Sequence, residues 1–512
     1  MKLLPYLVLC AGLAGNALAG PVVDTVNGKL EGKHVAGKVQ AFLGIPYAAS
    51  TAGENRWQPP QPVTPWQGVR QATEFGPICA QPEPVEFGPW TDEFLAQGDM
   101  SEDCLSLNVW TPQVKAKDLP VMVWIHGGGM TTGSSDVPIY NGAHLASQDV
   151  VVVSINYRLG VLGFLAHPEL ESENGLSGEY GILDQIAALK WVHNNIAQFG
   201  GDPGNVTIAG QSAGAASVKL LMSTEATRGL YRKAMIQSGI GLAGFAPPGN
   251  FAKALRVGKQ LQQDLNADNL AAMRNIPAAD VISAAAQVKL PGENGRIRFS
   301  VRQGKTFGDK FDDSSIPVLT GITGAEASAF RPLKTLSKAD FNAYVERRYG
   351  NLADDFLQLY PGDDDNYVNE SLALRRDEGL ASMKLRLQQD DAPKTAYGYL
   401  FAEHPPGEPE GYASFHSGEL PYMFGNLAPG KRPYSKADEK LSATMVKYWV
   451  AFLKDKSPRK KLQDWPQLDS SNQIMVFGGE NTHAVQPLLS KEKLDLFIRH
   501  HNNGGDVKLI DL

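Results

Sequence analysis

The chain has 512 residues, of which 43% are hydrophobic and 20% charged, and its formal net charge is −7. This is the composition of an ordinary globular protein, and the length would allow several domains. The negative charge and the lack of a basic tail argue against nucleic acid as a partner.

The N-terminus reads MKLLPYLVLCAGLAGNALAG. Lys2 is followed by an apolar run to Leu9, and Ala17-Leu18-Ala19 has the small-x-small pattern of a cleavage site. Residues 1–19 therefore predict a secretory signal peptide that is cut after Ala19. A membrane anchor is the alternative, but the apolar run is too short for one. No later segment has eighteen apolar residues in a row. We expect a secreted or periplasmic protein without a stable membrane anchor.

Of the three cysteines, Cys10 lies in the predicted signal peptide. Cys79 and Cys104 remain in a chain bound for an oxidising compartment, which favours a disulfide between them. Closing a loop of this size stabilises a protein by roughly 3 kcal/mol. Two free buried thiols are the alternative.

Short β-branched runs alternate with longer amphipathic segments along the chain. We expect strands at 121–126, 150–157, 206–209, 233–237, 316–321 and 396–401. Helices are expected at 180–199, where Ile182, Ile186 and Leu189 share a face, and at 213–222. The alternation predicts an α/β fold with a mostly parallel sheet that helices cover on both faces. Three stretches are less regular: 63–100, which is rich in Pro, Trp and Phe; 242–313, which is helical and then polar and basic; and the acidic loop 361–366.

Residues 209–214 read AGQSAG, between the strand expected at 206–209 and the next helix. A Gly-x-Ser-x-Gly match alone is weak, but a strand that enters it and a helix that leaves it are typical of a nucleophile elbow. Gly210 and Gly214 have no Cβ to clash in so tight a turn. We interpret Ser212 as a nucleophile, with the Ala213 N–H at the helix start facing the substrate.

A serine hydroxyl needs a base, and the base needs an orienting acid. The histidines that follow Ser212 are His404, His416, His483, His500 and His501. The position of His416 in a loop after a predicted strand favours it as the base. Residues 126–129 read HGGG directly after a predicted strand, as an oxyanion-hole loop does, although a flexible turn would give the same letters. His126 itself is expected to be a packed histidine.

These residues resemble the type-B carboxylesterases of the α/β-hydrolase fold, a family that includes the cholinesterases. The matches run in order over nearly the whole mature chain: FLGIPYA (42–48), SEDCLSLNVWTP (101–112), NYRLGVLGF (156–164), AGQSAG (209–214), GITGAEAS (321–328) and FHSGELPYMFG (415–425). Because residues 127–129 and His416 must then meet at one site, the resemblance implies a single domain over residues 20–512.

The resemblance also implies roles for individual residues. Ser212 would be the nucleophile, Glu326 the acid and His416 the base. The oxyanion hole would be formed by Gly128, Gly129 and Ala213, the disulfide by Cys79 and Cys104, and a buried structural pair by Arg158 and Asp184. No metal or organic cofactor is needed for this chemistry.

The chain departs from the family pattern at three places near the substrate. Gln211 precedes the nucleophile where the family often has Glu, which argues against a choline-like cation as substrate. Met130 follows the glycines where an aromatic residue is common. A methionine there would make the wall of the substrate pocket more flexible. The segment before residue 316 is basic and includes Arg298 and Arg302. It is either a solvated loop or a pocket rim that attracts an anionic ester.

The sequence thus predicts a serine carboxylesterase that acts on a small-molecule ester through an acyl-enzyme on Ser212. A carbamate or amide hydrolase, or an esterase for an anionic ester, could use the same triad, and a lipase acting at an interface is a further alternative. A non-catalytic binding protein with the same fold is a remote one. Nothing in the sequence indicates an oligomeric state.

Overall fold

The computed structural model describes residues 20–242, 251–290, 299, 307–308, 310–331, 334–362, 365–407, 411–455, 462–468, 472–479 and 483–510. The predicted signal peptide, residues 1–19, lies outside the described residues, as do Arg298 and Arg302.

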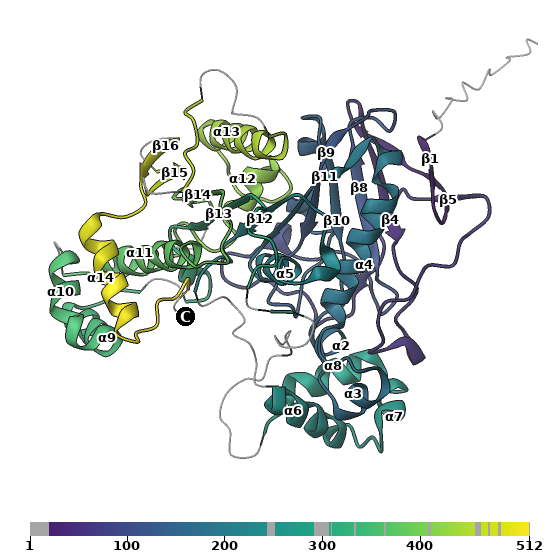
Figure 1. Cartoon of the computed structure of the whole chain (residues 1–512), viewed down its shortest axis with the longest axis horizontal. Coiled ribbons are helices and arrows are strands. Elements are labelled where there is room, and N and C mark those ends of the chain that lie inside the picture. The colour runs from purple at the N-terminus through teal and green to yellow at the C-terminus, as the bar shows by residue number, and fades with distance from the viewer. Residues whose placement is uncertain are drawn as a thin grey trace, which may run out of the picture.

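A large sheet runs through the described part of the molecule in the strand order β16-β15-β14-β13-β12-β11-β9-β10-β8-β4-β3 (Figure 1). The neighbours from β10 through β15 pair in parallel, whereas β16 and the β8-β4-β3 end are antiparallel. Its strands are β3 (Lys33–Ala36), β4 (Val39–Pro46), β8 (Ser106–Thr111), β9 (Leu119–Ile125), β10 (Val151–Ile155), β11 (Gly201–Gln211), β12 (Lys233–Gln237), β13 (Val318–Thr323), β14 (Ala396–Phe401), β15 (Gln473–Phe477) and β16 (His483–Pro487). Two small sheets are formed by β1 (Val22–Thr25), β2 (Gly28–Glu31) and β5 (Val69–Gln71), and by β6 (Ile78–Cys79) and β7 (Met100–Ser101).

Helices cover both faces of the large sheet. They are α1 (Ala143–Ala146), α2 (Gly160–Phe164), α3 (Pro168–Asn174), α4 (Tyr180–Asn195), α5 (Ala213–Leu221), α6 (Phe251–Asp264), α7 (Leu270–Arg274), α8 (Ala278–Gln287), α9 (Lys338–Tyr349), α10 (Ala353–Leu359), α11 (Val368–Leu387), α12 (Leu420–Phe424), α13 (Lys436–Leu453) and α14 (Lys491–Asn502). Residues of α4, α5 and α11 join one core cluster, and residues of α1, α12 and α13 join another.

Strand β9 shows why the sheet needs both layers. Val121, Val123 and Ile125 belong to the first core cluster, while Met122 and Trp124 belong to the second. Successive side chains of a strand point to opposite faces, so a strand that is apolar throughout must be covered twice. Burial of each such side chain contributes about 1.5–3 kcal/mol. The predicted α/β class and its doubly covered parallel sheet are confirmed.

The expected elements are present with shifted ends. The strand expected at 206–209 is longer, Gly201–Gln211, and the helix expected at 180–199 ends at Asn195 and continues as a 3₁₀ turn, Ile196–Phe199. The stretch 63–100 is mostly irregular, as expected. The described residues of the acidic loop 361–366 form no helix or strand.

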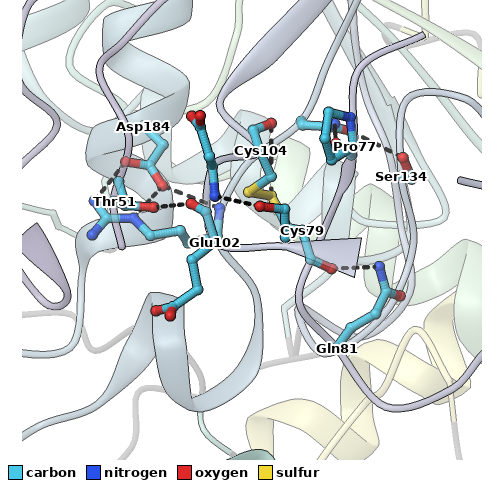
Figure 2. Close-up of a disulfide and its surroundings, with 12 residues drawn as sticks. Thr51, Pro77, Cys79, Gln81, Glu102, Cys104, Ser134 and Asp184 are labelled. Atoms are coloured by element: carbon cyan, nitrogen blue, oxygen red, sulfur yellow. Dashed lines mark hydrogen bonds and ion pairs between the residues drawn. A yellow bond between two sulfur atoms is a disulfide. The ribbon is translucent and has the colours of Figure 1, made fainter. Parts of the chain in front are cut away.

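The disulfide between Cys79 and Cys104 is formed, with an S–S distance of 2.03 Å (Figure 2). Beside it, the Gln81 amide donates to the Cys79 carbonyl at 3.0 Å and to the Gly133 carbonyl at 2.9 Å. The disulfide joins the irregular stretch to the segment before β8, and Gln81 joins it to the loop that follows β9. The disulfide also points to an oxidising compartment. Among the helices of the described residues, none is both long and apolar enough to cross a membrane.

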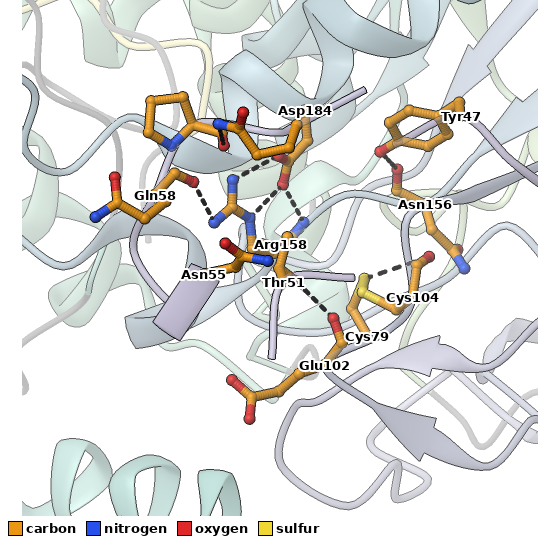
Figure 3. A network of polar contacts seen from close by, with 12 residues as sticks. Tyr47, Thr51, Asn55, Gln58, Cys79, Glu102, Cys104, Asn156, Arg158 and Asp184 are labelled. Carbon is orange, nitrogen blue, oxygen red and sulfur yellow. Dashed lines mark hydrogen bonds and ion pairs between the residues drawn. A yellow bond between two sulfur atoms is a disulfide. The ribbon is translucent and has the colours of Figure 1, made fainter. Parts of the chain in front are cut away.

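Arg158 and Asp184 form the expected buried pair (Figure 3). The guanidinium donates from Nη2 to Asp184 Oδ1 at 2.6 Å and from Nε to Oδ2 at 2.8 Å, and it also reaches the Gln58 carbonyl at 2.8 Å. Removing one member of such a pair leaves a buried charge without compensation, which costs about 3–5 kcal/mol. The pair holds the start of α4 against the segment after β10.

Candidate active site

The elbow predicted around Ser212 is present at the carboxyl end of β11. Ser212 has φ 58° and ψ −123°, a strained conformation for a residue with a side chain, and α5 begins at the next residue. The turn is tight enough to exclude other residues at both glycines. A Cβ on Gly210 would lie 2.4 Å from the Gly214 carbonyl carbon, and one on Gly214 would lie 2.0 Å from the Ile125 carbonyl oxygen. The tight turn holds Ser212 between the end of β11 and the start of α5.

Glu326 and His416 lie together, although 90 residues separate them in the chain. Glu326 opens a 3₁₀ turn after β13, and its Oε2 contacts His416 Nδ1. Its other oxygen accepts from Ser238 Oγ at 2.6 Å and from the Thr323 N–H at 2.8 Å. Both side chains are buried. A carboxylate held by two other donors can orient an imidazole with its Nδ1–H toward the acid, which makes Nε2 the acceptor nitrogen.

Gln211 also reaches this imidazole. Its Nε2 lies 3.1 Å from His416 Nε2, and its Oε1 accepts from Ser417 Oγ at 3.1 Å. With Nδ1–H donated to Glu326, Nε2 is the acceptor of this contact. Gln211 is therefore part of the buried hydrogen-bond network around the histidine, and as a neutral amide it adds no charge there.

The glycine loop after β9 runs directly beside the serine. A Cβ on Gly127 would lie 3.2 Å from Ser212 Cβ, and one on Gly128, whose φ is 103°, would lie 2.1 Å from the Thr132 carbonyl oxygen. Only glycine fits such a close backbone approach. Gly127, Gly128, Gly129 and Ser212 all line one cavity. Ala213 is the first residue of α5, so its N–H belongs to the orphan donors of a helix start.

His126 is packed, as expected, and takes no part in this network. Its Nδ1 lies 2.8 Å from the Gly127 carbonyl oxygen, and its ring stacks on Tyr157 with centroids 4.5 Å apart. Burial lowers the pKa of His126 to about 4. It is therefore neutral and has no access to the cavity as a base.

The cavity that contains Ser212 and His416 has a volume of about 510 Å³, a size typical of small-molecule sites. Its wall is aromatic: Trp90, Phe94, Tyr140, Phe299 and Phe330 line it. Phe330 lies 5.5 Å from the His416 ring, centroid to centroid, and Trp90 lies 6.4 Å from it, edge to face. The arrangement suits a neutral, apolar group next to the serine.

The expected rim residues are only partly in this wall. Gln211 lines the cavity, but Met130 does not: its side chain is 2% exposed and belongs to the core cluster on the α5 side of the sheet. The expectation for Met130 is thus replaced by a packing role. Arg298 and Arg302 lie outside the described residues, whereas Phe299, next to Arg298 in the chain, lines the cavity.

Sequence reasoning missed a buried polar cluster behind Glu326. Glu419, three residues after His416, is 0% exposed, and its Oε1 accepts from Gln237 Nε2 at 3.2 Å and Tyr399 OH at 3.4 Å. Burial, together with the nearby Glu326 carboxylate, raises the pKa of Glu419 to about 7. Gln237 ends β12, and the carboxyl ends of parallel strands are where polar site residues gather. That rule could have identified Gln237, but no local signal marks Glu419.

The described residues contain no cluster of three or more His, Cys, Asp or Glu side chains that could hold a metal ion.

The model of the Carboxylesterase family matches residues 19–497. The chain belongs to the carboxylesterase family. It is 36% identical to a fumonisin B1 esterase of Sphingopyxis macrogoltabida, over 90% of this chain and 86% of that protein. It is 34% identical to a para-nitrobenzyl esterase of Bacillus subtilis strain 168, over 92% of this chain and 98% of that protein. A solved structure of a PNB esterase superposes with a TM-score of 0.73 at 30% identity, covering 93% of this chain and 99% of that one. The α/β-hydrolase fold is confirmed, and this carboxylesterase is a carboxylic ester hydrolase.

Proposed function

We propose that this carboxylesterase cleaves small-molecule esters through an acyl-enzyme on Ser212, with His416 as base and Glu326 as the orienting acid. The observation that carries the proposal is that His416, which contacts Glu326, lines the same cavity as the strained Ser212. Ser212 Oγ attacks the ester carbonyl carbon while His416 Nε2 takes its proton. Glu326 stabilises the imidazolium that forms. When the tetrahedral intermediate collapses, His416 returns the proton to the leaving alcohol, and a water molecule then repeats the cycle on the acyl group.

We propose further that the oxyanion is bound by the backbone N–H groups of Gly128, Gly129 and Ala213. Such donors act on charge that develops in the transition state, and each contributes roughly 3–4 kcal/mol. The close approach of the glycine loop to Ser212 supports this role, because a Cβ on Gly127 would already lie 3.2 Å from Ser212 Cβ.

The test is a series of p-nitrophenyl esters from acetate to palmitate, with wild type and Ser212→Ala measured side by side. We expect the variant to lose on the order of 10⁴–10⁶ in kcat. Ser217→Ala is a matched control, because Ser217 is a buried serine of α5, the helix that follows Ser212, and its hydroxyl accepts from the Gln185 amide at 3.0 Å. Equal turnover by wild type and Ser212→Ala would refute the assignment.

A second candidate concerns the acid part of the substrate. Because Phe299 lines the cavity and belongs in sequence to the basic segment that includes Arg298 and Arg302, we propose that an ester with a free carboxylate is also accepted. Charge reversal at Arg298 and Arg302 should then raise KM for a carboxylated ester and leave KM for a neutral ester unchanged. Equal effects on both substrates would exclude this specificity.

We also propose that the protein is exported, is cut after Ala19, and forms one catalytic domain from residue 20 to 512. The disulfide supports export, because such bonds persist in oxidising compartments. N-terminal sequencing of the exported protein should begin at Gly20, and a chain that still carries residues 1–19 would contradict the cleavage.

A further inference from the structure

An irregular loop between the two disulfide cysteines forms one wall of the active-site cavity. We call residues 82–98 the wall loop; Phe87, Trp90 and Phe94 are its aromatic members that line the cavity. Two backbone hydrogen bonds join Phe87 and Trp90, at 3.2 and 3.1 Å. Trp90 packs edge-on against Phe330, with centroids 5.1 Å apart, and faces the His416 ring. The position of the wall loop therefore decides how much room lies beside the histidine.

A buried arginine from a distant part of the chain holds this loop. The side chains of Arg432 and Glu93 form an ion pair, and each is 4% exposed. Arg432 Nη2 also donates to the Pro89 carbonyl at 2.6 Å and to Thr91 Oγ1 at 2.9 Å. Thr91 in turn donates to Glu93 Oε2 at 2.8 Å. One planar guanidinium thus binds three positions of the wall loop, which a lysine ammonium could not reproduce.

The same guanidinium lies between the wall loop and the segment that carries His416. Its Cζ lies 5.4 Å from the ring centroid of Phe94 and 5.5 Å from that of Phe415. The two rings are 6.0 Å apart, edge to face. Phe415 is fully buried and directly precedes His416. Arg432 consequently couples the cavity wall to the backbone of the proposed base.

The wall loop needs such an anchor because it has little regular secondary structure of its own. Its only helical piece is one 3₁₀ turn, Asp92–Phe94, and the disulfide fixes only the ends of the enclosing segment. We infer that Arg432 is a positioning residue that holds Trp90 and Phe94 in place and so sets the size of the substrate group that the cavity accepts. This inference rests on the proposal that Ser212 and His416 carry the reaction.

Arg432→Lys tests the inference, because lysine keeps the positive charge opposite Glu93 but loses the planar guanidinium that also donates to Pro89 and Thr91. Losing one or two hydrogen bonds that order the wall should raise KM for a long-chain p-nitrophenyl ester about tenfold. For p-nitrophenyl acetate, which is too small to depend on the wall, kcat and KM should stay within about twofold. A uniform loss on both esters would mean that Arg432 only stabilises the fold, and would overturn the inference.

Arg386→Lys is the matched control. Arg386 is also buried, pairs with Asp391 at 2.8 Å and lies over an aromatic ring, that of Phe311, at 4.3 Å. Neither side chain of that pair lines the cavity. We expect this variant to keep the wild-type ratio of the two esters even where its melting temperature falls. The same ratio change in both arginine variants would refute a specific role for Arg432.

Hydrogen exchange of the resting protein gives a readout that does not depend on turnover. Amides of the wall loop, among them those of Phe87 and Trp90, should exchange faster in Arg432→Lys than in wild type or Arg386→Lys. Unchanged protection would overturn the inference whatever the kinetics. Failure of the proposed function would appear separately, as turnover that persists in Ser212→Ala.

Discussion

Glu419 should make the stability of this carboxylesterase fall as the pH rises from 4.5 to 7. Its carboxyl group is completely buried, and among the described residues nothing hydrogen-bonds to its Oε2. Burial raises the pKa of Glu419 from 4.5 to about 7, and the neighbouring Glu326 carboxylate adds to the effect. Below pH 4.5 the carboxyl group of Glu419 is protonated in both the folded and the unfolded chain, so its titration does not change the free energy of unfolding. Between 4.5 and 7 only the unfolded chain releases the proton, which favours unfolding.

The size of this effect follows from the shift. A difference of about 2.5 pKa units corresponds to about 3 kcal/mol at 1.36 kcal/mol per unit. Glu419→Gln removes the titration while keeping an acceptor for Gln237 and Tyr399. Its amide group adds a cost that does not change with pH. The free energy of unfolding of the variant, relative to wild type, should therefore increase by about 3 kcal/mol between pH 4.5 and pH 7, and then level off.

Thermal unfolding across this pH range is the assay. For a folded chain of about 490 residues, 3 kcal/mol corresponds to a relative rise in Tm of about 3 °C. Glu439→Gln, at an exposed glutamate of α13, is the control and should show no comparable trend. A difference in Tm between Glu419→Gln and wild type that stays constant from pH 4.5 to 8 would refute the reasoning, whatever its sign.

Three further substitutions probe the site directly. Gln211→Glu puts a carboxylate where an amide nitrogen now lies 3.1 Å from His416 Nε2, which stabilises the protonated imidazole by about 1–4 kcal/mol. The acid limb of the pH profile of kcat/KM should therefore move up by about 1–3 pH units. An unmoved profile would contradict the contact between residue 211 and His416. Ser238→Ala removes the 2.6 Å hydrogen bond to Glu326 and should lower kcat about tenfold or more with KM nearly unchanged. A change in KM alone would contradict an effect through Glu326. Gly214→Ala places a Cβ 2.0 Å from a backbone carbonyl oxygen of β9, so we expect both Tm and activity to fall. A fully stable and active variant would show that the elbow can relax.

The parallel strands β9 to β14 could be predicted because each contains a short apolar run. The strands at the two ends of the sheet could not. Strand β4 contains Gly44 and Pro46 and pairs with β8 through a shifted register, so neither a clean alternation nor a continuous apolar run marks it. Strands β15 and β16 follow acidic and polar segments and gain their apolar partners only from the tertiary packing of β14 and α13.

Ser212 could be found from local sequence, because the elbow requires glycines at two fixed offsets. Glu326 could not be separated from the other acidic residues without the family resemblance, since its role depends on donors from Ser238 and Thr323 that only the fold brings near. The packing of Met130 could not be predicted, because proximity in sequence to the glycine loop does not say which way a residue with φ 58° directs its side chain.

The distance in sequence between the serine and its histidine has a consequence for how the protein matures. Gln211 and His416 meet across 205 residues, and the arginine that orders the cavity wall comes later still, at position 432. Contacts of such range form late, because the chain must first close a very large loop. With the roles proposed above for Ser212 and His416, a ribosome that has completed only the first four hundred residues has made the nucleophile but not its base. The proposed triad is then complete only when the segment that carries His416 has packed beside Glu326.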